Sequence, residues 1–431
     1  MDLRLENLGI AISEVPTRRR SGRIVKLVGT VMEAELPGTR IGEVCRVEGG
    51  PLAEAIGFRE NRAVLMPFGA LEGIRFGSTV ETTGEIASVR IGEALRGRVV
   101  DGFGEPLDGK GPILTQGNWP LHLPPPDPMT RTPIRNPFVT GVRLLDGLLT
   151  FGKGQRVGLM AGSGVGKSTL MGMIARNSQA DINVIALIGE RGREVREFIE
   201  DVLGPEGLAR SVVVVVTSDR PPVLQVRGAF VAATIADWFR AQGRDVLFFM
   251  DSVTRLAMAQ RQIGLAAGEP PTTKGYTPSV FSLLPRLLER AGASELGTIT
   301  GIYTVLIDGD DIQDPIGDAV RSILDGHIVL TRKLAVHGQY PSVDVLQSIS
   351  RVARAVTTQA HRELAQRFRG HLAVWSENEE LIRLGAYKNG SSPQVDAAVS
   401  RIDAIRAFLM QDVAERTTLE QAMAGMAAVV K

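Results

Sequence analysis

Apolar and polar positions follow different patterns in different parts of the chain. From residue 22 to about 89, short apolar runs such as RIVKLVGTVMEAEL and AVLMPFG are separated by turn residues. Many short strands at close spacing predict a small β-barrel or sandwich. From about residue 154 to 345, apolar runs such as SVVVVVTS and DVLFFMD alternate with stretches of helical spacing. This alternation predicts a mostly parallel sheet covered by helices, so the predicted fold class is α/β.

The remaining segments lie at the ends of the chain and between these two regions. The first 20 residues place Leu3, Leu5 and Leu8 loosely on one face, which leaves open a frayed terminus or a helix that binds a partner. A stretch rich in Gly and Pro predicts an extended connection, and a mostly helical pattern ends the chain. We predict four parts, namely a terminal segment (1–20), a β-barrel domain (21–90), an α/β domain with its Pro/Gly-rich connection (91–347) and a helical domain (348–431).

A glycine-rich turn in the α/β region carries the strongest chemical signal. In AGSGVGKSTL, a short strand precedes the glycines and a stretch of helical spacing follows them. A phosphate-binding loop requires that context, because backbone N–H groups and a helix N-terminus then point at one anion. Lys167 can reach the β- and γ-phosphates, and Ser168 can ligate Mg²⁺. The strict pattern begins with Gly where this chain has Ala161, and we expect the loop to close nonetheless. The predicted cradle consists of Gly162, Ser163, Gly164, Val165 and Gly166.

Composition excludes several classes of protein. The chain has 431 residues, of which 44% are hydrophobic, and this excludes global disorder. Its 49 basic and 48 acidic residues give a net charge of +1, which argues against a dedicated nucleic-acid binder. The single cysteine, Cys45, cannot form an internal disulfide. No apolar run reaches transmembrane length. The N-terminus lacks the layout of a secretory signal. We therefore expect a cytoplasmic protein that reaches a membrane only through partners.

Two acidic residues end predicted strands of the α/β region. Asp251 closes the run RDVLFFMD, and Glu190 closes NVIALIGE. The carboxyl ends of parallel strands share one edge of a sheet, so Asp251 could hold the water shell of a bound Mg²⁺. Glu190 could polarise the water that attacks the γ-phosphate. The pattern alone leaves Arg191 open as a phosphate ligand or a solvated loop charge, and it shows Arg351 as one arginine among many.

Several long segments together resemble the ATPases of flagellar and type III protein export, which are similar in turn to the α and β subunits of F-type ATP synthase. The match runs from about residue 22 to 431. The resemblance implies an N-terminal β-barrel, a central RecA-like P-loop ATPase domain and C-terminal helices. Details such as GLAAGEPPTTKGY favour the flagellar branch. The matching segments are AGSGVGKST, IGERGREV, LFFMDSVTRLAMAQR, GEPPTTKGYTPSVFSLLPRLLERAG, DGDDIQDPIGDAVRSILDGHIVLTRKLA and YPSVDVLQSISRV.

The resemblance also implies a role for each matching residue. Glu190 matches the carboxylate that activates water, and non-catalytic α-type subunits carry Gln there. Arg351 matches the arginine finger that reaches into the next subunit's site, and Arg191 matches a phosphate-contacting arginine. The further matches are Thr169 near the α-phosphate, Arg255 near the γ-phosphate, Tyr340 stacked on adenine, and Asp251 at the water shell of Mg²⁺.

The implied activity is Mg²⁺-dependent ATP hydrolysis by a homohexamer that unloads or unfolds export substrates from their chaperones. The implied partners are a regulatory, stator-like protein at the N-terminal segment, chaperone–substrate complexes at the C-terminal domain and the export gate at the inner membrane, with no nucleic acid. Alternatives are an injectisome ATPase, a rotary synthase subunit, an RNA translocase and a non-catalytic scaffold. The acidic loop by which rotary subunits contact their shaft has no full match in this sequence. The stretch SENEEL at 376–381 matches it in part, and we interpret that stretch as a helix start.

Overall fold

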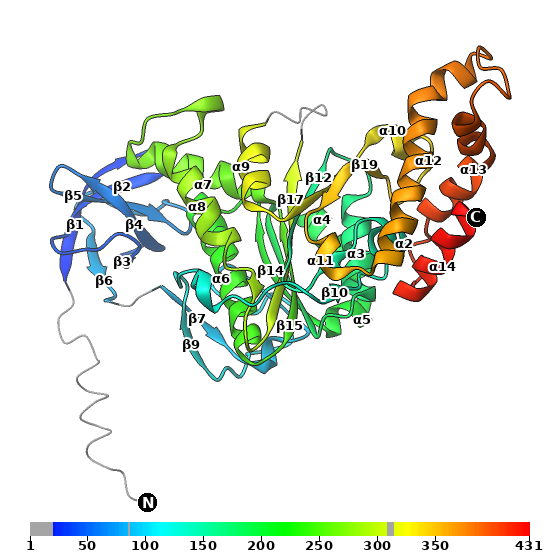
Figure 1. Cartoon of the computed structure of the whole chain (residues 1–431). Coiled ribbons are helices and arrows are strands. Elements are labelled where there is room, and N and C mark those ends of the chain that lie inside the picture. Colours follow the sequence, from blue (N-terminus) through cyan, green and yellow to red (C-terminus); the bar gives the residue numbers. More distant parts are fainter. Residues whose placement is uncertain (1–19, 85–86, 308–313) are drawn as a thin grey trace, which may run out of the picture.

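The computed structural model describes residues 20–84, 87–307 and 314–431, so nearly all of the predicted terminal segment lies outside the described residues. Within the described ranges, three bodies follow one another across Figure 1: a β-barrel, a sheet flanked by helices and a group of C-terminal helices. The barrel and the C-terminal helices lie at opposite ends. This confirms the predicted α/β architecture with its barrel and helical additions.

Between residues 20 and 84, all of which are described, six short antiparallel strands close a barrel in the order β1-β2-β5-β4-β3-β6. Side chains such as Met32, Leu65 and Val80 fill its interior. Cys45 is fully buried in this core, where burial raises the pKa of its thiol to about 12. The strands are β1 (Ser21–Val28), β2 (Val31–Glu35), β3 (Val44–Val47), β4 (Leu52–Arg59), β5 (Arg62–Pro67) and β6 (Thr79–Thr82).

The segment after the barrel runs along the central domain in short pieces. β7 (Ser88–Ile91), which begins inside the range predicted for the barrel domain, pairs with β9 (Gly117–Pro120) in a separate two-stranded sheet. β8 (Arg98–Val100) joins the edge of the central sheet. The other elements of this segment are η1 (Glu93–Leu95), η2 (Pro128–Thr130), β10 (Pro137–Phe138), α2 (Arg143–Leu148) and β11 (Phe151–Gly152).

In the described part of the chain, the central sheet has nine strands, eight of them in the order β19-β18-β12-β17-β15-β13-β14-β8 and the ninth, β16, beside β17. The pairs among these described strands are parallel except β18–β19 and β16–β17. β13 is buried along its whole length, as a strand covered on both faces must be. The strands are β12 (Arg156–Ala161), β13 (Ile182–Glu190), β14 (Ser211–Thr217), β15 (Asp245–Asp251), β16 (Gly292–Ala293), β17 (Thr298–Leu306), β18 (Gly326–Leu330) and β19 (Val343–Ser350).

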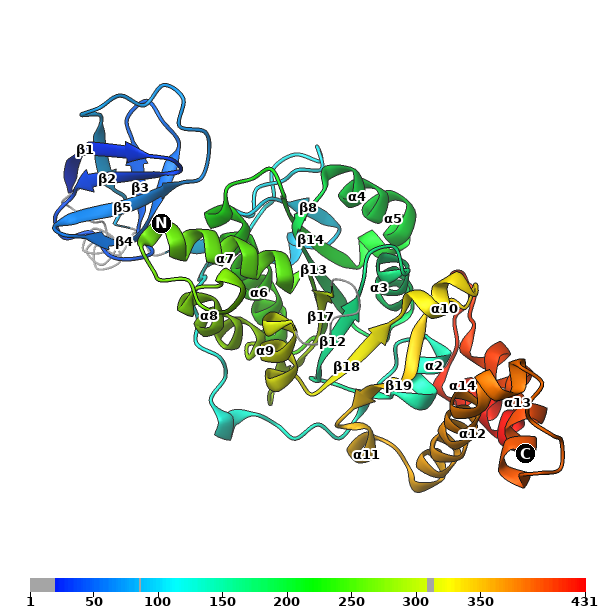
Figure 2. The ribbon, with the colours of Figure 1, turned by 90° about the horizontal axis from the view of Figure 1, so that it is seen from above.

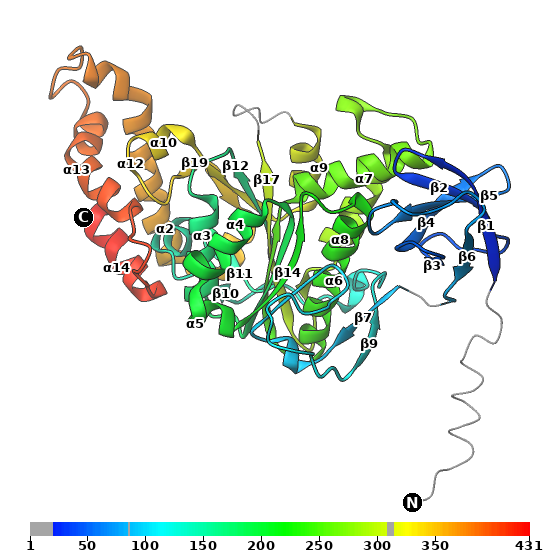
Figure 3. The same cartoon turned by 180° about the vertical axis from the view of Figure 1, so that it is seen from behind.

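Helices cover both faces of this sheet, as Figure 3 shows from behind. One core packs α6 to α8 against the face nearer the barrel, around residues such as Phe230 and Phe248. The other core joins α2, α3 and the C-terminal helices to the opposite face, around Leu170, Phe249 and Phe408. The helices are α3 (Lys167–Asn177), α4 (Gly192–Glu197), the π-helical η3 (Phe198–Leu203), α5 (Gly204–Ala209), α6 (Pro222–Ala241), α7 (Val253–Ala267), η4 (Thr273–Gly275), α8 (Pro278–Leu288), α9 (Pro315–Ile323) and α10 (Arg332–Val336).

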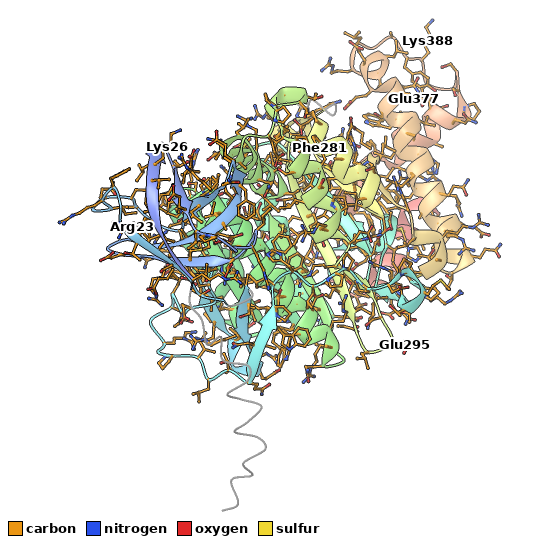
Figure 4. The ribbon with its side chains drawn as sticks, turned by 90° about the vertical axis from the view of Figure 1, so that its left-hand side faces the viewer. Arg23, Lys26, Phe281, Glu295, Glu377 and Lys388 are labelled. Carbon is orange, nitrogen blue, oxygen red and sulfur yellow. The ribbon has the colours of Figure 1, made fainter. Side chains whose placement is uncertain are left out.

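The C-terminal body consists of α11 (Ala353–Val356), α12 (Gln359–Arg383), α13 (Pro393–Leu409) and α14 (Leu419–Val430). The stretch 376–381 lies inside α12, so its interpretation as a helix start was wrong. The helix begins where the Thr358 side chain accepts a hydrogen bond from the backbone N–H of His361, and a stripe that includes Phe368 and Trp375 carries it onward. In Figure 4, Glu377 and Lys388 stand at the exposed tip of this body, far from the barrel.

A buried ion pair fastens α6 to the residues that follow α8. Arg290, which is 2% exposed, contacts Asp237 through Nε (2.8 Å) and Nη2 (2.5 Å). Its Nη1 also donates to the carbonyl oxygen of Leu121 in the connection (2.8 Å). The guanidinium therefore holds three segments of the barrel-side face together.

We expect Arg290→Met to lower the free energy of unfolding by about 3 kcal/mol or more, because Asp237 would remain buried with only Arg240 beside it. Urea unfolding followed by circular dichroism measures the change. Arg286→Met, on the exposed side of α8, is the matched control and should stay within about 0.5 kcal/mol of wild type. Equal midpoints for the two variants would contradict the importance of this pair.

Candidate active site

The phosphate-binding loop and both predicted carboxylates meet at one edge of the sheet. β12 ends at Ala161 and passes through the loop into α3, while β13 and β15 end at Glu190 and Asp251. Because these strands are parallel, their carboxyl ends share the edge that Figure 2 shows from above, beside α3 and α10. β17 separates β12 from β15.

The loop backbone has the left-handed turns that its glycines were expected to supply. Gly164 has φ +76° and Gly166 has φ +87°, and Gly166 is the N-cap of α3, with no side chain hydrogen-bonded to that cap. Val165 between them is buried, and its carbonyl oxygen accepts a hydrogen bond from Ser342 Oγ (2.6 Å). This hydrogen bond from Ser342 anchors the loop, while Ser168 in the first turn of α3 stays exposed. The start of α3 presents a partial positive charge suited to phosphate.

Two carboxylates and two cations form a compact cluster beside the loop. Lys167 Nζ lies 2.5 Å from Asp251 Oδ1 and 3.9 Å from Glu190 Oε1. Arg255 Nε lies 3.3 Å from the same Glu190 oxygen. Glu190 is 7% exposed and Asp251 is 4% exposed, so the two negative charges are compensated where water has little access. The structure therefore brings together four of the residues that the sequence singled out.

Glu190 is in a setting that favours proton uptake. Burial is the largest cause that raises the pKa of its carboxyl, and the nearby Asp251 charge raises it further. Lys167 and Arg255 act in the opposite direction. A raised pKa makes a carboxylate a stronger base, as a group that takes a proton from water requires.

Three positions that sequence reasoning missed hold this arrangement in place. Gly189 has φ +73°, and the register of β13 against β14 shifts there, so a bulge re-aims Glu190. A Cβ at Gly189 would come within 2.9 Å of Arg255. Thr304 donates to Asp251, and Ser342 donates to the loop. The only signal in the sequence was the glycine before Glu190, because the two hydroxyl groups come from segments distant along the chain.

Tyr340 lies against the end of the loop. A Cβ added to Gly166 would stand 3.4 Å from its ring, and the side chain is half exposed. The backbone N–H of Gln411, from the C-terminal body, donates to the Tyr340 carbonyl oxygen (3.0 Å). Thr169 lies in the first turn of α3, partly buried. A half-exposed aromatic ring beside the phosphate loop is suited to stacking on a base.

Two predicted arginines lie away from the cluster. Arg191 is 73% exposed, and its Nη1 points to Glu194 on the surface (3.4 Å). Arg351 follows β19, whose register pairs Ser350 with Gly326 at the amino end of β18. The loop lies beyond the other end of β18, about 13 Å further at the rise of a strand. Arg351 is exposed at the opposite edge of the sheet and cannot serve the loop of its own chain.

The oxygen donors at this edge fit a Mg²⁺ ion that a nucleotide and water would help to hold. Asp251 and the hydroxyl of Ser168 are hard oxygen donors of the kind Mg²⁺ prefers. Among the described residues, no group of three or more His, Cys, Asp or Glu could hold a metal ion by itself. A Mg²⁺ ion here would therefore depend on the phosphate oxygens of a nucleotide and on water for its remaining ligands.

The described helices include none that is both long and apolar enough to cross a bilayer.

Three family models match the chain in consecutive ranges. The beta-barrel domain of the ATP synthase alpha/beta family matches residues 24–84, and the nucleotide-binding domain of that family matches residues 141–350. The T3SS EscN ATPase C-terminal domain matches residues 357–428. These three ranges coincide with the barrel, the sheet domain and the C-terminal helices.

The chain is 52% identical over 432 residues to the flagellum-specific ATP synthase of Bacillus subtilis (strain 168), with 98% of each chain covered. It is 51% identical over 410 residues to the type 3 secretion system ATPase of Xanthomonas euvesicatoria, covering 94% of this chain and 93% of that one. The assembled ATPase EscN of the enteropathogenic E. coli type III secretion system matches with a TM-score of 0.92 at 46% identity, covering 95% of this chain and all of that one. EscN in complex with its central stalk EscO matches with a TM-score of 0.89 at the same identity and coverage. The resemblance seen in the motifs is confirmed, and the chain belongs to the family of flagellar and type III secretion ATPases.

Proposed function

We propose that the chain hydrolyses Mg²⁺-bound ATP at this edge of the sheet, within a homohexamer, to energise export of flagellar proteins. The observation that carries the proposal is the buried Glu190 carboxylate beside the loop lysine. A glutamine at this position could bind nucleotide equally well but could not accept a proton. Glu190 therefore favours an enzyme over a non-catalytic nucleotide-binding scaffold.

Nucleotide binding is assigned to the loop and its neighbours. The backbone of Gly162 to Gly166 and the start of α3 cradle the phosphates, and Lys167 places its ammonium group against the β- and γ-phosphates. Ser168 and, through water, Asp251 would hold Mg²⁺, which would neutralise charge on the phosphate oxygens. Thr169 lies nearest the α-phosphate, and Tyr340 stacks on the adenine ring.

Hydrolysis is assigned to the carboxylate cluster. Glu190 orients a water molecule and accepts its proton while the water oxygen bonds to the γ-phosphorus and the bond to the bridging oxygen breaks. Arg255, 3.3 Å from Glu190, keeps the carboxylate oriented and faces the γ-phosphate. Arg191 contacts phosphate after rotating away from its surface partner. The products are ADP and inorganic phosphate.

A second copy of the chain completes the site. Arg351 lies too far from its own loop to neutralise charge there, and its exposed position suits an arginine finger offered to a neighbour. The similarity to EscN, solved in an assembled state, supports a ring of identical subunits.

We assign the partners and the location by similarity to the family. EscN was solved with its central stalk EscO, so we assign a stalk-type partner to this chain as well. Chaperone–substrate complexes are assigned to the C-terminal body, a regulatory stator-like protein to the N-terminal segment, and the export gate to contacts made through partners. The ring would be cytoplasmic and peripheral to the inner membrane. An injectisome ATPase is the second candidate, because relatives of both kinds are about equally similar. A rotary synthase subunit is less well supported, because the C-terminal match is to the EscN ATPase domain.

Lys167→Ala should weaken ATP binding by about 100-fold, because the loop loses the charge that faces the phosphates. Titration with a fluorescent ATP analogue measures the affinity. Lys26→Ala, on the exposed barrel surface labelled in Figure 4, should bind like wild type. Normal affinity in a folded Lys167→Ala protein would refute the phosphate-loop assignment.

Glu190→Gln should keep ATP binding and assembly but lose about 10²–10⁴ in turnover, because an amide of the same size cannot take up the proton. A phosphate-release assay on protein matched for oligomeric state measures the loss. Glu197→Gln removes an exposed carboxylate seven residues further on, which pairs with Arg193, and should leave turnover unchanged. Wild-type turnover in Glu190→Gln would place the general base elsewhere.

Arg351→Ala should bind ATP like wild type and lose about 10³–10⁵ in rate, because each ring would lack its fingers. Mixing this variant with Lys167→Ala, which has a finger but no functional loop, should restore part of the activity at interfaces that combine the two intact halves. Arg354→Ala, a nearby exposed arginine, is the control and should remain active. Full activity of Arg351→Ala alone would exclude a shared site.

A further inference from the structure

Asp251 is held by a hydroxyl group from the neighbouring strand. Thr304 is fully buried on β17, the strand between β12 and β15, and its Oγ1 lies 2.6 Å from Asp251 Oδ1. The same hydroxyl lies 3.3 Å from the carbonyl oxygen of Met250. Its single proton therefore goes to the carboxylate, which is both closer and the stronger acceptor.

Strand register delivers this hydroxyl to the site. Tyr303 pairs with Met250 across β17 and β15, so the following residues, Thr304 and Asp251, come side by side at the strand ends. On the other side, β17 pairs with β12 through Thr304 and Leu159. Thr254 Oγ1 in α7 also accepts a hydrogen bond from the backbone N–H of Leu306 (2.9 Å), which fastens the end of β17. Thr304 is thus a fixed donor held by backbone pairing on both sides.

Asp251 Oδ1 has a second partner of a different kind. Lys167 Nζ lies 2.5 Å from the same oxygen, but this ammonium group belongs to the phosphate loop. Nucleotide phosphates compete for its charge, whereas nothing in a nucleotide competes for a hydroxyl buried in the sheet. Thr304 is therefore the donor that stays on Oδ1 while Lys167 turns to the phosphates. The other carboxylate oxygen is left for the water shell of the metal.

We propose that Thr304 is a positioning residue for metal-dependent nucleotide binding, acting by holding the Asp251 carboxylate in its working orientation. The inference rests on the proposed function, which assigns Asp251 to the Mg²⁺ water shell. Groups that orient a metal-holding side chain typically change metal affinity by about 10–100-fold when they are removed. A threonine that only filled space or satisfied a strand end would affect stability and not the metal contribution.

The test separates the contribution of the metal from that of the loop. The dissociation constant of a fluorescent ATP analogue is measured at saturating Mg²⁺ and again in EDTA, for wild type and for Thr304→Val, which has the same shape without the hydroxyl. The dissociation constant in EDTA divided by the dissociation constant in Mg²⁺ reports how much the metal strengthens binding. We expect this ratio to fall about 10-fold in Thr304→Val while the affinity in EDTA stays within about 2-fold. Thr304→Ser should restore the ratio, because it keeps the hydroxyl.

Thr300→Val is the matched control. Thr300 is fully buried on the same strand, and its hydroxyl accepts a hydrogen bond from the backbone N–H of Gly154 (2.9 Å), away from the site. It should lower stability without changing the ratio. Thr304→Ala offers the same comparison if the valine variant does not fold.

An unchanged ratio in Thr304→Val or Thr304→Ala would overturn the proposal, as would an equal loss of affinity with and without Mg²⁺. In either case a wild-type protein that hydrolyses ATP in Mg²⁺ would leave the proposed function standing. A wild-type ring without Mg²⁺-dependent ATP binding or hydrolysis would overturn the proposed function and this inference together.

Discussion

The pairing of buried charges at the carboxyl edge of the sheet governs the rest of the site. Glu190 and Asp251 end two adjacent parallel strands, and Lys167 and Arg255 compensate them within a region that is almost closed to water. Each buried charge without a partner would cost several kcal/mol. The same pairing places the residues proposed as the base, the metal-holding carboxylate and the phosphate-binding ammonium group within one cluster.

The segment between β18 and β19 connects this edge to the C-terminal body. Ser342 holds the loop through Val165, and Tyr340 is held in turn by Gln411. Lys333 in α10 forms an ion pair with Glu379 in α12 (3.1 Å). A cavity of about 840 Å³ lies between the two bodies, lined from both sides and open to the loop at Gly162. The glycine-rich loop and the C-terminal helices thus share one short segment as their physical link.

The sequence predicted the elements whose signals are local. The loop, its flanking strand and helix, and the strand-end acids follow from adjacent residues, and the barrel follows from its short alternating strands. The positions that depend on distant pairing were missed. Thr304 meets Asp251 through strand register across 53 residues, and Ser342 meets Val165 across 177. The acidic stretch in α12 was misread because a serine before glutamates resembles a helix N-cap. The helix in fact begins at Gln359, and apolar side chains upstream of the stretch pack it against the core. The role implied for Arg351 needs a second chain, and the role implied for Arg191 needs its side chain to leave Glu194.

We propose that ATP hydrolysis takes place in a site that two chains complete. ATPase activity per chain, measured across a wide range of protein concentration with the molecular mass determined in the same samples, tests this claim most directly. If the site is shared, activity per chain rises in step with the assembled fraction, because only an interface brings Arg351 to a neighbour's loop. Activity per chain that stays constant down to a demonstrated monomer would contradict it.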